Sequence, residues 1–237
     1  MSIIKIYFHI CMINNWQEIV EHLFQAIVDS GLVHQNIQVN YVALGDTQSL
    51  SLIPKIKYYN NFKSIQLIGH STDISIYERL CLNKLHADAI ANPSALFLYI
   101  HTKSISHKEV NPNVRDWLHY LIYFNIIQYQ HCLKMLTIAD TCGVDCRSKP
   151  YLHYSGNFWW ANGSYISKIS PTISPDYLGP EMWLLSLDGV KAGNLWSSNV
   201  HHYMQPYPKY KYENKEIKPA ICQQSAPGCI NFIYVSL

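Results

Sequence analysis

Ionisable and amide side chains stand at the ends of apolar runs in this chain. His101 and Lys103 follow directly after an apolar run of strand length, and His9 and Asn14 lie at and just beyond the end of the first such run. Glu181 comes after Gly-Pro, at the start of an expected helix. Cationic groups can neutralise a leaving phosphate, and a carboxylate can take a hydroxyl proton. The set therefore suits a sugar that is attached to a phosphate.

A second candidate binding segment is HYSGNFWWANGSYI, which begins at His153. Trp159 and Trp160 are adjacent, so they cannot both face one side of a strand, and at least one faces a cavity, a second layer or a ligand. Gly156 before Asn157 indicates that the backbone closely approaches another group. Aromatic faces and amides are what a pyranose ring needs for stacking and hydrogen bonding. The alternative is a turn leading into a helix, with both tryptophans in the core.

The elements that position these side chains begin with a β-α-β unit. Residues 3–11 predict a buried strand, residues 16–28 a helix after the N-cap Asn15, and residues 37–44 a second strand. A right-handed crossover puts the loop after the first strand at the carboxyl edge, where open α/β sheets bind ligands. No G-x-G-x-x-G motif occurs there, which disfavours a dinucleotide-binding Rossmann fold.

Strands and helices continue to alternate through the rest of the chain. The run ALFLYI at 95–100 is apolar enough for a central strand, whose polar carboxyl end then opens at the ligand edge. Asn111 and Pro112 predict the start of a long helix with Asp116 in its first turn. The other expected elements are strands at 64–68, 141–145 and 151–154, a last sheet strand at 190–196, and helices at 76–91, 114–136, 162–169 and 180–187.

Composition indicates one folded domain over residues 1–237, with 203–237 as an extended C-terminal segment. Of the 237 residues, 49% are hydrophobic and 14% are charged, with a formal net charge of +2. No basic stripe or zinc-finger spacing occurs, so we expect no nucleic-acid partner. No apolar run reaches the roughly 20 residues of a transmembrane segment, and the start lacks a signal-peptide cleavage site. We therefore expect a cytoplasmic protein with reduced thiols.

The motifs of several enzyme classes are missing from the sequence. There is no G-x-S-x-G elbow, P-loop or H-E-x-x-H, and Cys142 and Cys146 have no second pair at metal-ligand spacing. Two rival functions stay open beside sugar transfer. One is a carbohydrate-binding module that holds a glycan without turnover, and the other is a metal-dependent hydrolase that uses some of the 12 histidines.

Several short segments resemble a family of glycosyltransferase-like proteins found in large DNA viruses and bacterial polysaccharide clusters. The segments are FHICMINNW, YERLCLNKL, LYIHTKS, RDWLHYLIYFNI, CGVD, HYSGNFWWANGSYI, GPEMWL and HHYMQPYP. The chlorella-virus glycosyltransferase domain looks like a structural relative. The resemblance implies a GT-A-like three-layer α/β sandwich with a mixed central sheet. It also implies a nucleoside-diphosphate sugar donor, expected to be UDP-linked, a glycan or glycoprotein acceptor, and, for a viral protein, a place in the host cytoplasm or the virion.

The resemblance also implies roles for single residues. LYIHTKS stands where many GT-A enzymes carry the D-x-D that holds manganese, and here His101 and Lys103 replace the carboxylates. Dependence on manganese or magnesium is therefore open, because a lysine and a histidinium can neutralise the diphosphate themselves. Glu181 is the expected general base of an inverting attack, or orients the acceptor if configuration is retained. The expected donor-binding residues are His9, Asn14, Trp16, Tyr77, Glu78, His153, Gly156, Asn157 and His202, and the expected acceptor-binding residues are Trp159, Trp160 and Asp116.

Each of these side chains also has a purely structural interpretation. The strand histidines can be satisfied core residues. Glu181 and Asp116 can simply complement the amino ends of their helices. His201 and His202 face opposite ways if their segment is extended, and the sequence does not decide which of them faces the site.

Overall fold

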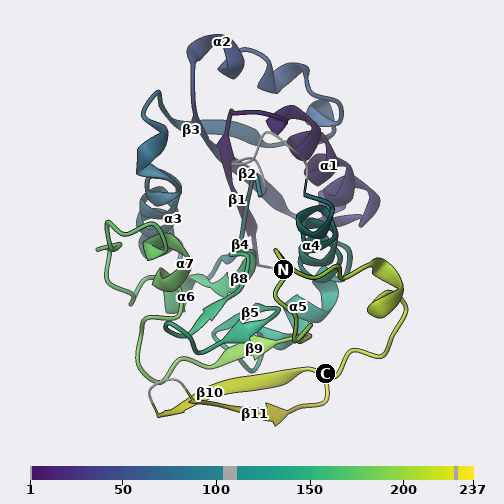
Figure 1. The fold of residues 1–237 in the computed structure, drawn as a ribbon. Helices are drawn as coiled ribbons and strands as arrows, with labels where there is room; N and C mark the ends of the chain where they lie inside the picture. Colours follow the sequence, from purple (N-terminus) through teal and green to yellow (C-terminus); the bar gives the residue numbers. More distant parts are fainter. Residues whose placement is uncertain (1, 104–110, 227–228) are drawn as a thin grey trace.

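The computed structural model describes residues 2–103, 111–226 and 229–237. Within these ranges a nine-stranded mixed sheet runs through the molecule (Figure 1). Its strands are β1 (Ile4–Cys11), β2 (Ile37–Leu44), β3 (Ile65–Ser71), β4 (Leu96–His101), β5 (Thr141–Gly143), β8 (Trp159–Asn162), β9 (Ala192–Asn194), β10 (Ala220–Ala226) and β11 (Cys229–Tyr234). The short strands β6 (Cys146–Arg147) and β7 (His153–Tyr154) pair with each other outside it.

The strand order is β11-β10-β9-β5-β8-β4-β1-β2-β3. Strands β3, β2, β1 and β4 are parallel, so their carboxyl ends meet at one edge. β8 is antiparallel to both of its neighbours, β4 and β5, while β5 and β9 are parallel to each other. The hairpin of β10 and β11 completes the sheet beside β9. The prediction of a mixed central sheet is therefore confirmed.

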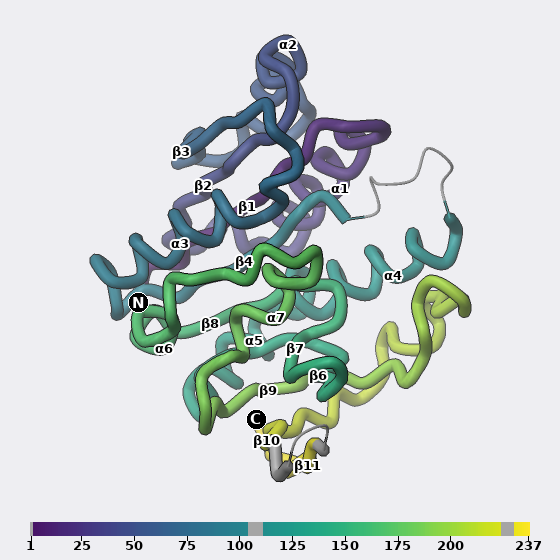
Figure 2. The backbone as a smooth tube through the Cα atoms, turned by 60° about the vertical axis from the view of Figure 1, so that its left-hand side comes forward, coloured from purple at the N-terminus to yellow at the C-terminus, as the bar shows by residue number. Residues whose placement is uncertain are grey.

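Helices cover both faces of the sheet (Figures 1 and 2). One face carries α1 (Trp16–Asp29), α4 (Pro112–Ile122) and α5 (Tyr129–Met135), and the other carries α3 (Arg79–Ala91), α6 (Gly163–Ile166) and α7 (Gly179–Trp183). This is the predicted three-layer α/β sandwich. Shorter elements are α2 (Thr47–Leu50) and 3₁₀ turns at Leu32–His34, Ile53–Lys55, Tyr59–Asn61, Ile74–Ile76 and Lys209–Lys211.

Strand β1 shows how the sequence fills both layers. Its even-numbered residues Ile4, Ile6, Phe8 and Ile10 pack in the core that contains α1 and α4, and Tyr7 packs on the α3 side. Side chains alternate between the faces of a strand, and both faces of β1 are covered, so the strand is apolar nearly throughout. The odd-numbered positions also include the polar residues Lys5 and His9. The Nζ of Lys5 lies 2.7 Å from Asp88 Oδ1 in a partly buried ion pair.

The segment with two tryptophans contains a core strand. Trp159 and Trp160 belong to β8, antiparallel to β4 and β5, and they are 1% and 0% exposed. Trp159 packs in the core on the α3 side and Trp160 in the core on the α1 side. The sequence prediction that they face opposite ways is confirmed. What each faces is a layer of the protein and not a ligand.

The long helix expected at 114–136 is interrupted by a π-helical turn at Tyr123–Ile127 between α4 and α5. This turn contains the fully buried Asn125, whose backbone carbonyl accepts the indole N–H of Trp160 at 2.8 Å. A π turn shifts a backbone carbonyl out of the regular helical ladder, so it can satisfy a donor from another element. The interruption thus provides a partner for an indole that would otherwise be buried without one.

The C-terminal part differs most from expectation. The strand expected at 190–196 forms at Ala192–Asn194, but it is not the last strand, because the hairpin of β10 and β11 extends the sheet beyond it. Residues 203–219 contain little regular structure apart from the turn at Lys209–Lys211. No helix in the described residues is long and apolar enough to cross a membrane.

Candidate functional site

A cavity of about 410 Å³ opens at the carboxyl ends of β1 and β4, and we call it the strand-end pocket. Its volume lies within the range of ligand sites, roughly 300 to 1,000 Å³. The described residues that line it are His9, Cys11, Ile13, Ile74, Ser75, Tyr77, Glu78, His101, Thr102, Lys103, Asn157, Tyr177, Leu178, Glu181 and Tyr203. Seven of these were predicted as site residues, namely His9, Tyr77, Glu78, His101, Lys103, Asn157 and Glu181.

Two buried imidazoles form the floor of the strand-end pocket. His9 and His101 are register partners on β1 and β4, and they are 4% and 8% exposed. Burial lowers the pKa of His9 to about 4 and that of His101 to about 3, because a charged ring is disfavoured away from water. Both rings are therefore neutral near pH 7, and the histidinium expected at His101 is not present. Thr102 ties the two strand ends together, because its Oγ1 accepts the Cys11 N–H at 2.9 Å.

Gly156 joins His101 to Glu181. The imidazole Nε2 of His101 donates to the Gly156 carbonyl at 3.0 Å, and the Gly156 N–H donates to Glu181 Oε1 at 2.8 Å. Gly156 has φ +96°, and a Cβ there would lie 2.7 Å from the Cδ1 of Leu121. The predicted close approach of the backbone is therefore confirmed, with Leu121 as the group approached. The other nitrogen of His101 lies 3.8 Å from Glu78 Oε1.

Lys103 supplies the ammonium among the described residues of the strand-end pocket. Its Nζ lies 3.9 Å from the ring centroid of Trp117, in a cation–π contact. Desolvation lowers the pKa of Lys103, while the nearby carboxylates of Glu181 and Glu78 act in the opposite direction. Ser104, the last residue of the LYIHTKS motif, lies outside the described residues.

A buried polar cluster lies behind Trp117. The indole of Trp117 stacks on the imidazole of His202, with centroids 5.1 Å apart and planes 5° apart. His202 Nε2 lies 2.9 Å from Asp145 Oδ2, and the Ser198 hydroxyl donates to the same oxygen at 2.7 Å. Asp145, Ser198 and His202 are all buried. His202 is thus the histidine of the pair that faces inward, and its neighbour His201 is exposed, but His202 supports Trp117 and does not line the pocket.

Two buried polar atoms of the strand-end pocket residues have no hydrogen-bond partner among the described residues. They are Nδ1 of His9 and Nδ2 of Asn157. The carbonyl side of the Asn157 amide is occupied, because its Oδ1 accepts the indole N–H of Trp159 at 2.9 Å. Buried polar atoms are normally paired, so unpaired ones beside a cavity point to groups that a ligand satisfies.

Several predicted site residues lie elsewhere. Asn14 is exposed in the turn after β1, and Trp16 is buried at the start of α1. His153 on β7 is buried, with its Nδ1 2.7 Å from the Tyr151 carbonyl. Asp116 lies half-buried on α4 and does not line the strand-end pocket. Neither Trp159 nor Trp160 lines it, and Gly156 contributes through its backbone hydrogen bonds.

The sequence prediction missed two of the three tyrosines of the strand-end pocket, Tyr177 and Tyr203. Tyr77 and Tyr177 pack edge to face with centroids 5.3 Å apart, and Tyr203 also lines the pocket. Arg79 holds the segment before Tyr177, because its guanidinium donates to the Ser174 carbonyl at 2.6 Å. The signal available for Tyr177 was its position two residues before the Gly-Pro that begins α7. Nothing in the sequence marked Tyr203.

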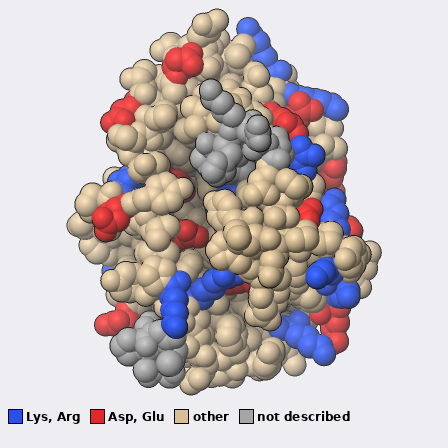
Figure 3. Space-filling view, viewed as in Figure 1, with Lys and Arg blue, Asp and Glu red and all other residues tan. Residues whose placement is uncertain are grey.

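Charge is weakly organised on the face of the molecule drawn in Figure 3. On the face drawn in Figure 3, basic and acidic side chains are scattered between large uncharged areas. Within the part of the chain that the structure describes, no three His, Cys, Asp or Glu side chains gather as potential metal ligands. Any ligand therefore meets the individual groups of the pocket and not a broad field of one sign.

Comparison with known proteins identifies a family, and the similar solved structures include two distant ones. The model of a family described as a domain of unknown function (DUF8361) matches residues 7–210. No curated protein matches the chain. The manganese complex of Rv0371C from Mycobacterium tuberculosis is 10% identical, with a TM-score of 0.35, and the match covers 71% of this chain and 77% of that one. A candidate nucleotide-diphospho-sugar transferase from Desulfovibrio desulfuricans is also 10% identical, with a TM-score of 0.36 and coverage of 76% and 74%.

Proposed function

This chain belongs to the DUF8361 family, and we propose that it is a glycosyltransferase that moves a sugar from a nucleoside diphosphate to a glycan or glycoprotein acceptor. Uridine diphosphate is the nucleotide we expect. The observation that carries the proposal is the convergence of Lys103, Glu181, Glu78 and two neutral imidazoles on one pocket at the carboxyl ends of parallel strands. Ligand sites of open α/β sheets lie at this edge.

Lys103 is proposed to stabilise the leaving diphosphate. As the bond between the sugar and the phosphate breaks, its electron pair leaves on the diphosphate oxygen, and an ammonium nearby lowers the energy of that charge. The contact with Trp117 limits where this ammonium can lie, because the Trp117 ring is itself stacked on His202. The leaving group is thereby assigned to the side of the pocket near Trp117.

Glu181 is proposed to act as the general base. Its Oε1 is held by the Gly156 N–H, and no hydrogen bond from a described residue engages Oε2. Oε2 can therefore take the proton of the acceptor hydroxyl while that oxygen bonds to the anomeric carbon. His101 becomes a positioning residue in this scheme, because it fixes Gly156 and through it Glu181. In a retaining reaction Glu181 would orient the acceptor instead.

The remaining pocket groups are proposed to hold the donor. Nδ1 of His9 and Nδ2 of Asn157 can pair with ligand hydroxyl or carbonyl groups, since both are buried and unpartnered among the described residues. Tyr77 and Tyr177 offer ring faces for a base or a sugar.

The described residues do not form a manganese or magnesium site by themselves. Hard cations of this kind prefer several oxygen ligands. The strand-end pocket has two carboxylates, Glu78 and Glu181, and one oxygen of Glu181 is already occupied by Gly156. No step of the mechanism is therefore assigned to a metal.

A carbohydrate-binding module is the second candidate. The strand-end pocket has two carboxylates against one ammonium among its described residues, and this balance opposes a diphosphate while leaving a neutral glycan unaffected. The two candidates differ in whether nucleotides bind and whether the donor is broken down.

The experiment that tests the proposal is thermal unfolding with UDP, other nucleoside diphosphates and their sugar conjugates, each with and without manganese. A ligand of the native state raises the unfolding midpoint by mass action. We expect one nucleotide family to raise it in the wild type, less in Lys103→Met, and undiminished in the exposed control Lys168→Met. Slow hydrolysis of the same donor should accompany binding. If no nucleotide raises the midpoint and neutral oligosaccharides do, the transferase is rejected in favour of the binding module.

A further inference from the structure

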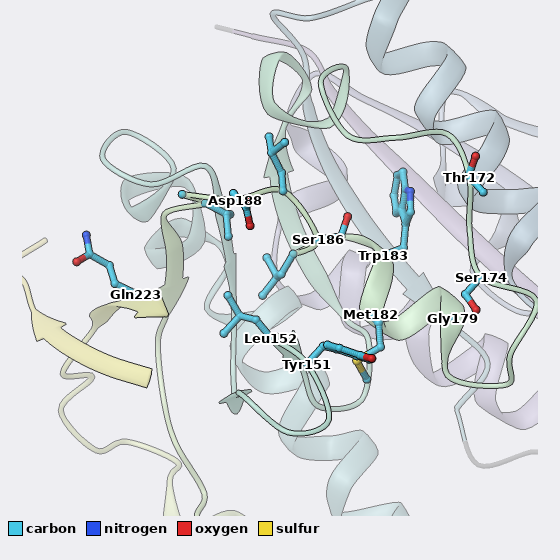
Figure 4. A pocket seen from close by; sticks show the side chains of 14 residues that line it. Tyr151, Leu152, Thr172, Ser174, Gly179, Met182, Trp183, Ser186, Asp188 and Gln223 are labelled. Atoms are coloured by element: carbon cyan, nitrogen blue, oxygen red, sulfur yellow. The ribbon is translucent and has the colours of Figure 1, made fainter. Parts of the chain in front are cut away.

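A second cavity lies against the other side of α7, and it is larger than the strand-end pocket. It has a volume of about 750 Å³. Figure 4 shows that its lining comes from three places: the segment with Tyr151 and Leu152, the chain on both sides of α7, and Gln223 on β10. Its lining contains none of the predicted site residues, and no step of the proposed reaction takes place in it.

The lining of the second cavity has an apolar floor. Leu152, Trp183, Leu185 and Val190 contribute to it and are at most 8% exposed. At the edge lies Tyr151, which is 71% exposed and forms no ring pair with another described residue. A tyrosine ring left open beside an apolar floor can stack on the C–H face of a sugar.

Solvent-exposed polar side chains also line the second cavity. The side chains of Thr172, Ser186, Asp188 and Gln223 all line the cavity, and none of them hydrogen-bonds another described residue. They offer both donors and acceptors, which is what hydroxyl groups of a ligand need. Specific sites for small molecules combine an apolar surface with a few such polar groups.

The charge of the lining excludes anions. The described residues of the second cavity include no lysine, arginine or histidine, and their one charged group is the carboxylate of Asp188. Phosphates and nucleotides are therefore disfavoured, because they would meet a like charge and no counter-charge. A neutral oligosaccharide fits this lining, because its ring faces can stack on the tyrosine and its hydroxyls can pair with the polar side chains.

The two cavities share a wall. Leu178 and Glu181 line the strand-end pocket, while Gly179 and Met182, their immediate neighbours in sequence, line the second cavity. The wall is closely packed, because Gly179 lies so near the Ser174 carbonyl that a Cβ would not fit between them. Arg79 donates a hydrogen bond to the same carbonyl. A ligand in the second cavity thus lies one short helix away from the proposed general base.

From these observations we propose that the second cavity binds a neutral oligosaccharide, namely the part of the acceptor glycan that is remote from the reacting hydroxyl. The acceptor role rests on the transferase proposed above, whereas the carbohydrate site itself does not. Tyr151 provides the stacking platform, and Ser186, Asp188 and Gln223 provide the hydrogen bonds. The wall around α7 separates this site from the chemistry at Glu181.

The test is calorimetric titration without any nucleotide, using maltotetraose, cellotetraose, chitotetraose and mannotetraose as probes. We expect at least one probe to bind. Tyr151→Ala, which removes the platform, and Ser186→Trp, which fills the cavity, should each weaken binding by about tenfold or more, since a lost aromatic contact of about 1.4 kcal/mol corresponds to tenfold. Tyr210→Ala, which removes an equally exposed tyrosine away from the cavity, should leave binding unchanged. Unchanged unfolding midpoints would verify that the variants are folded.

The outcomes separate this inference from the proposed function. Donor hydrolysis without acceptor measures the strand-end pocket alone. If the protein hydrolyses the donor but binds none of the probes, the oligosaccharide site is rejected and the proposed transferase function is retained. Probe binding that survives Tyr151→Ala and Ser186→Trp but is lost in Glu181→Gln also overturns it. A third outcome is that a probe binds through Tyr151 while no nucleotide binds to the protein. That result would support a carbohydrate site in the second cavity and reject its role as an acceptor site.

Discussion

The strand-end pocket and the second cavity share the wall at α7 but are lined by different kinds of groups. The smaller one, about 410 Å³, contains two imidazoles, an ammonium and two carboxylates, and the larger one, about 750 Å³, contains hydroxyls, an amide and one carboxylate. Parallel strands collect ionisable side chains at their carboxyl edge, whereas the larger cavity is built where loops pack around a short helix. The volume of a cavity thus indicates whether a ligand fits, and the ionisable groups in its lining indicate whether a reaction can take place there.

The largest effect that would sharpen this contrast is expected for Glu181→Gln. Loss of the general base should lower kcat by about 10² to 10⁴-fold, because an amide cannot take the hydroxyl proton. Glu213→Gln, an exposed carboxylate outside both cavities, is the matched control and should keep kcat. Steady-state kinetics with donor and acceptor measure both. A Glu181→Gln enzyme with full kcat would remove the distinction between a reacting and a binding cavity.

Lys103→Met should follow, with a loss of about 10² to 10³-fold in kcat, the size typical for removing one group that stabilises developing charge. The methionine keeps an apolar contact with Trp117 but supplies no charge. The same assay on Lys168→Met shows whether loss of any lysine has this effect. Equal activity of the two variants would mean that no leaving diphosphate meets Lys103.

Asp145→Ala should reduce the free energy of unfolding by about 3 to 5 kcal/mol. Removing one partner of a buried pair leaves the other partner buried without its counterpart. Asp145 accepts hydrogen bonds from the backbone N–H and hydroxyl of Ser198 and contacts His202, so the Ser198 N–H would lose its partner. The Ser198 hydroxyl and His202 Nε2 would lose the carboxylate and keep their own contact of 3.0 Å. Asp188→Ala, on the exposed lining of the second cavity, should change it by less than about 0.5 kcal/mol. Urea unfolding compares them. Similar losses would show that both cavities depend on buried polar networks.

The smallest expected effect, taken per pH unit and per histidine, is a pH dependence of stability that comes from the floor of the strand-end pocket. His9 and His101 have pKa values lowered from 6.5 to about 4 and about 3, so below pH 6.5 the unfolded chain binds protons that the folded chain does not. The free energy of unfolding should therefore fall on acidification, by about 1.4 kcal/mol per pH unit for each histidine, until the folded pKa is reached.

Urea unfolding at pH 7, 6 and 5 measures this slope, and His101→Gln should make it shallower. The exposed His201→Gln is the control and should leave it as in the wild type. A slope that His101→Gln does not change would mean that His101 is not held neutral by burial.

The sequence predicted the part of the site that depends on strand ends. His101 and Lys103 follow β4, and the ALFLYI run that identifies β4 is so apolar that its central position could be inferred without a structure. The same rule could have found Asp145, which follows β5, a strand with the same direction as β4. Of its partners, His202 was predicted as a donor-binding residue. Its contact with Asp145 and the part played by Ser198 could not be predicted, because both residues come from an irregular segment whose position depends on packing.

In the HYSGNFWWANGSYI segment the sequence led to the opposite error, because it assigned core residues to ligand binding. Its aromatic side chains indicated ligand binding, yet Trp159 and Trp160 are core residues. The residues of this segment that reach the strand-end pocket are Asn157, which lines it, and Gly156, whose N–H donates to Glu181. A tryptophan that stacks on a sugar and one that fills a core have the same sequence signal. The local feature that separates them here is the left-handed backbone of Gly156 and Asn157, a conformation that these two residue types favour.

The adjacent tryptophans of β8 have a consequence for the cooperativity of the molecule. Trp159 is embedded in one layer and Trp160 in the other, so neither layer can detach without withdrawing an indole that belongs to the same strand. We expect the two layers to melt in a single transition, with the fluorescence of these two indoles changing together with the loss of helical circular dichroism.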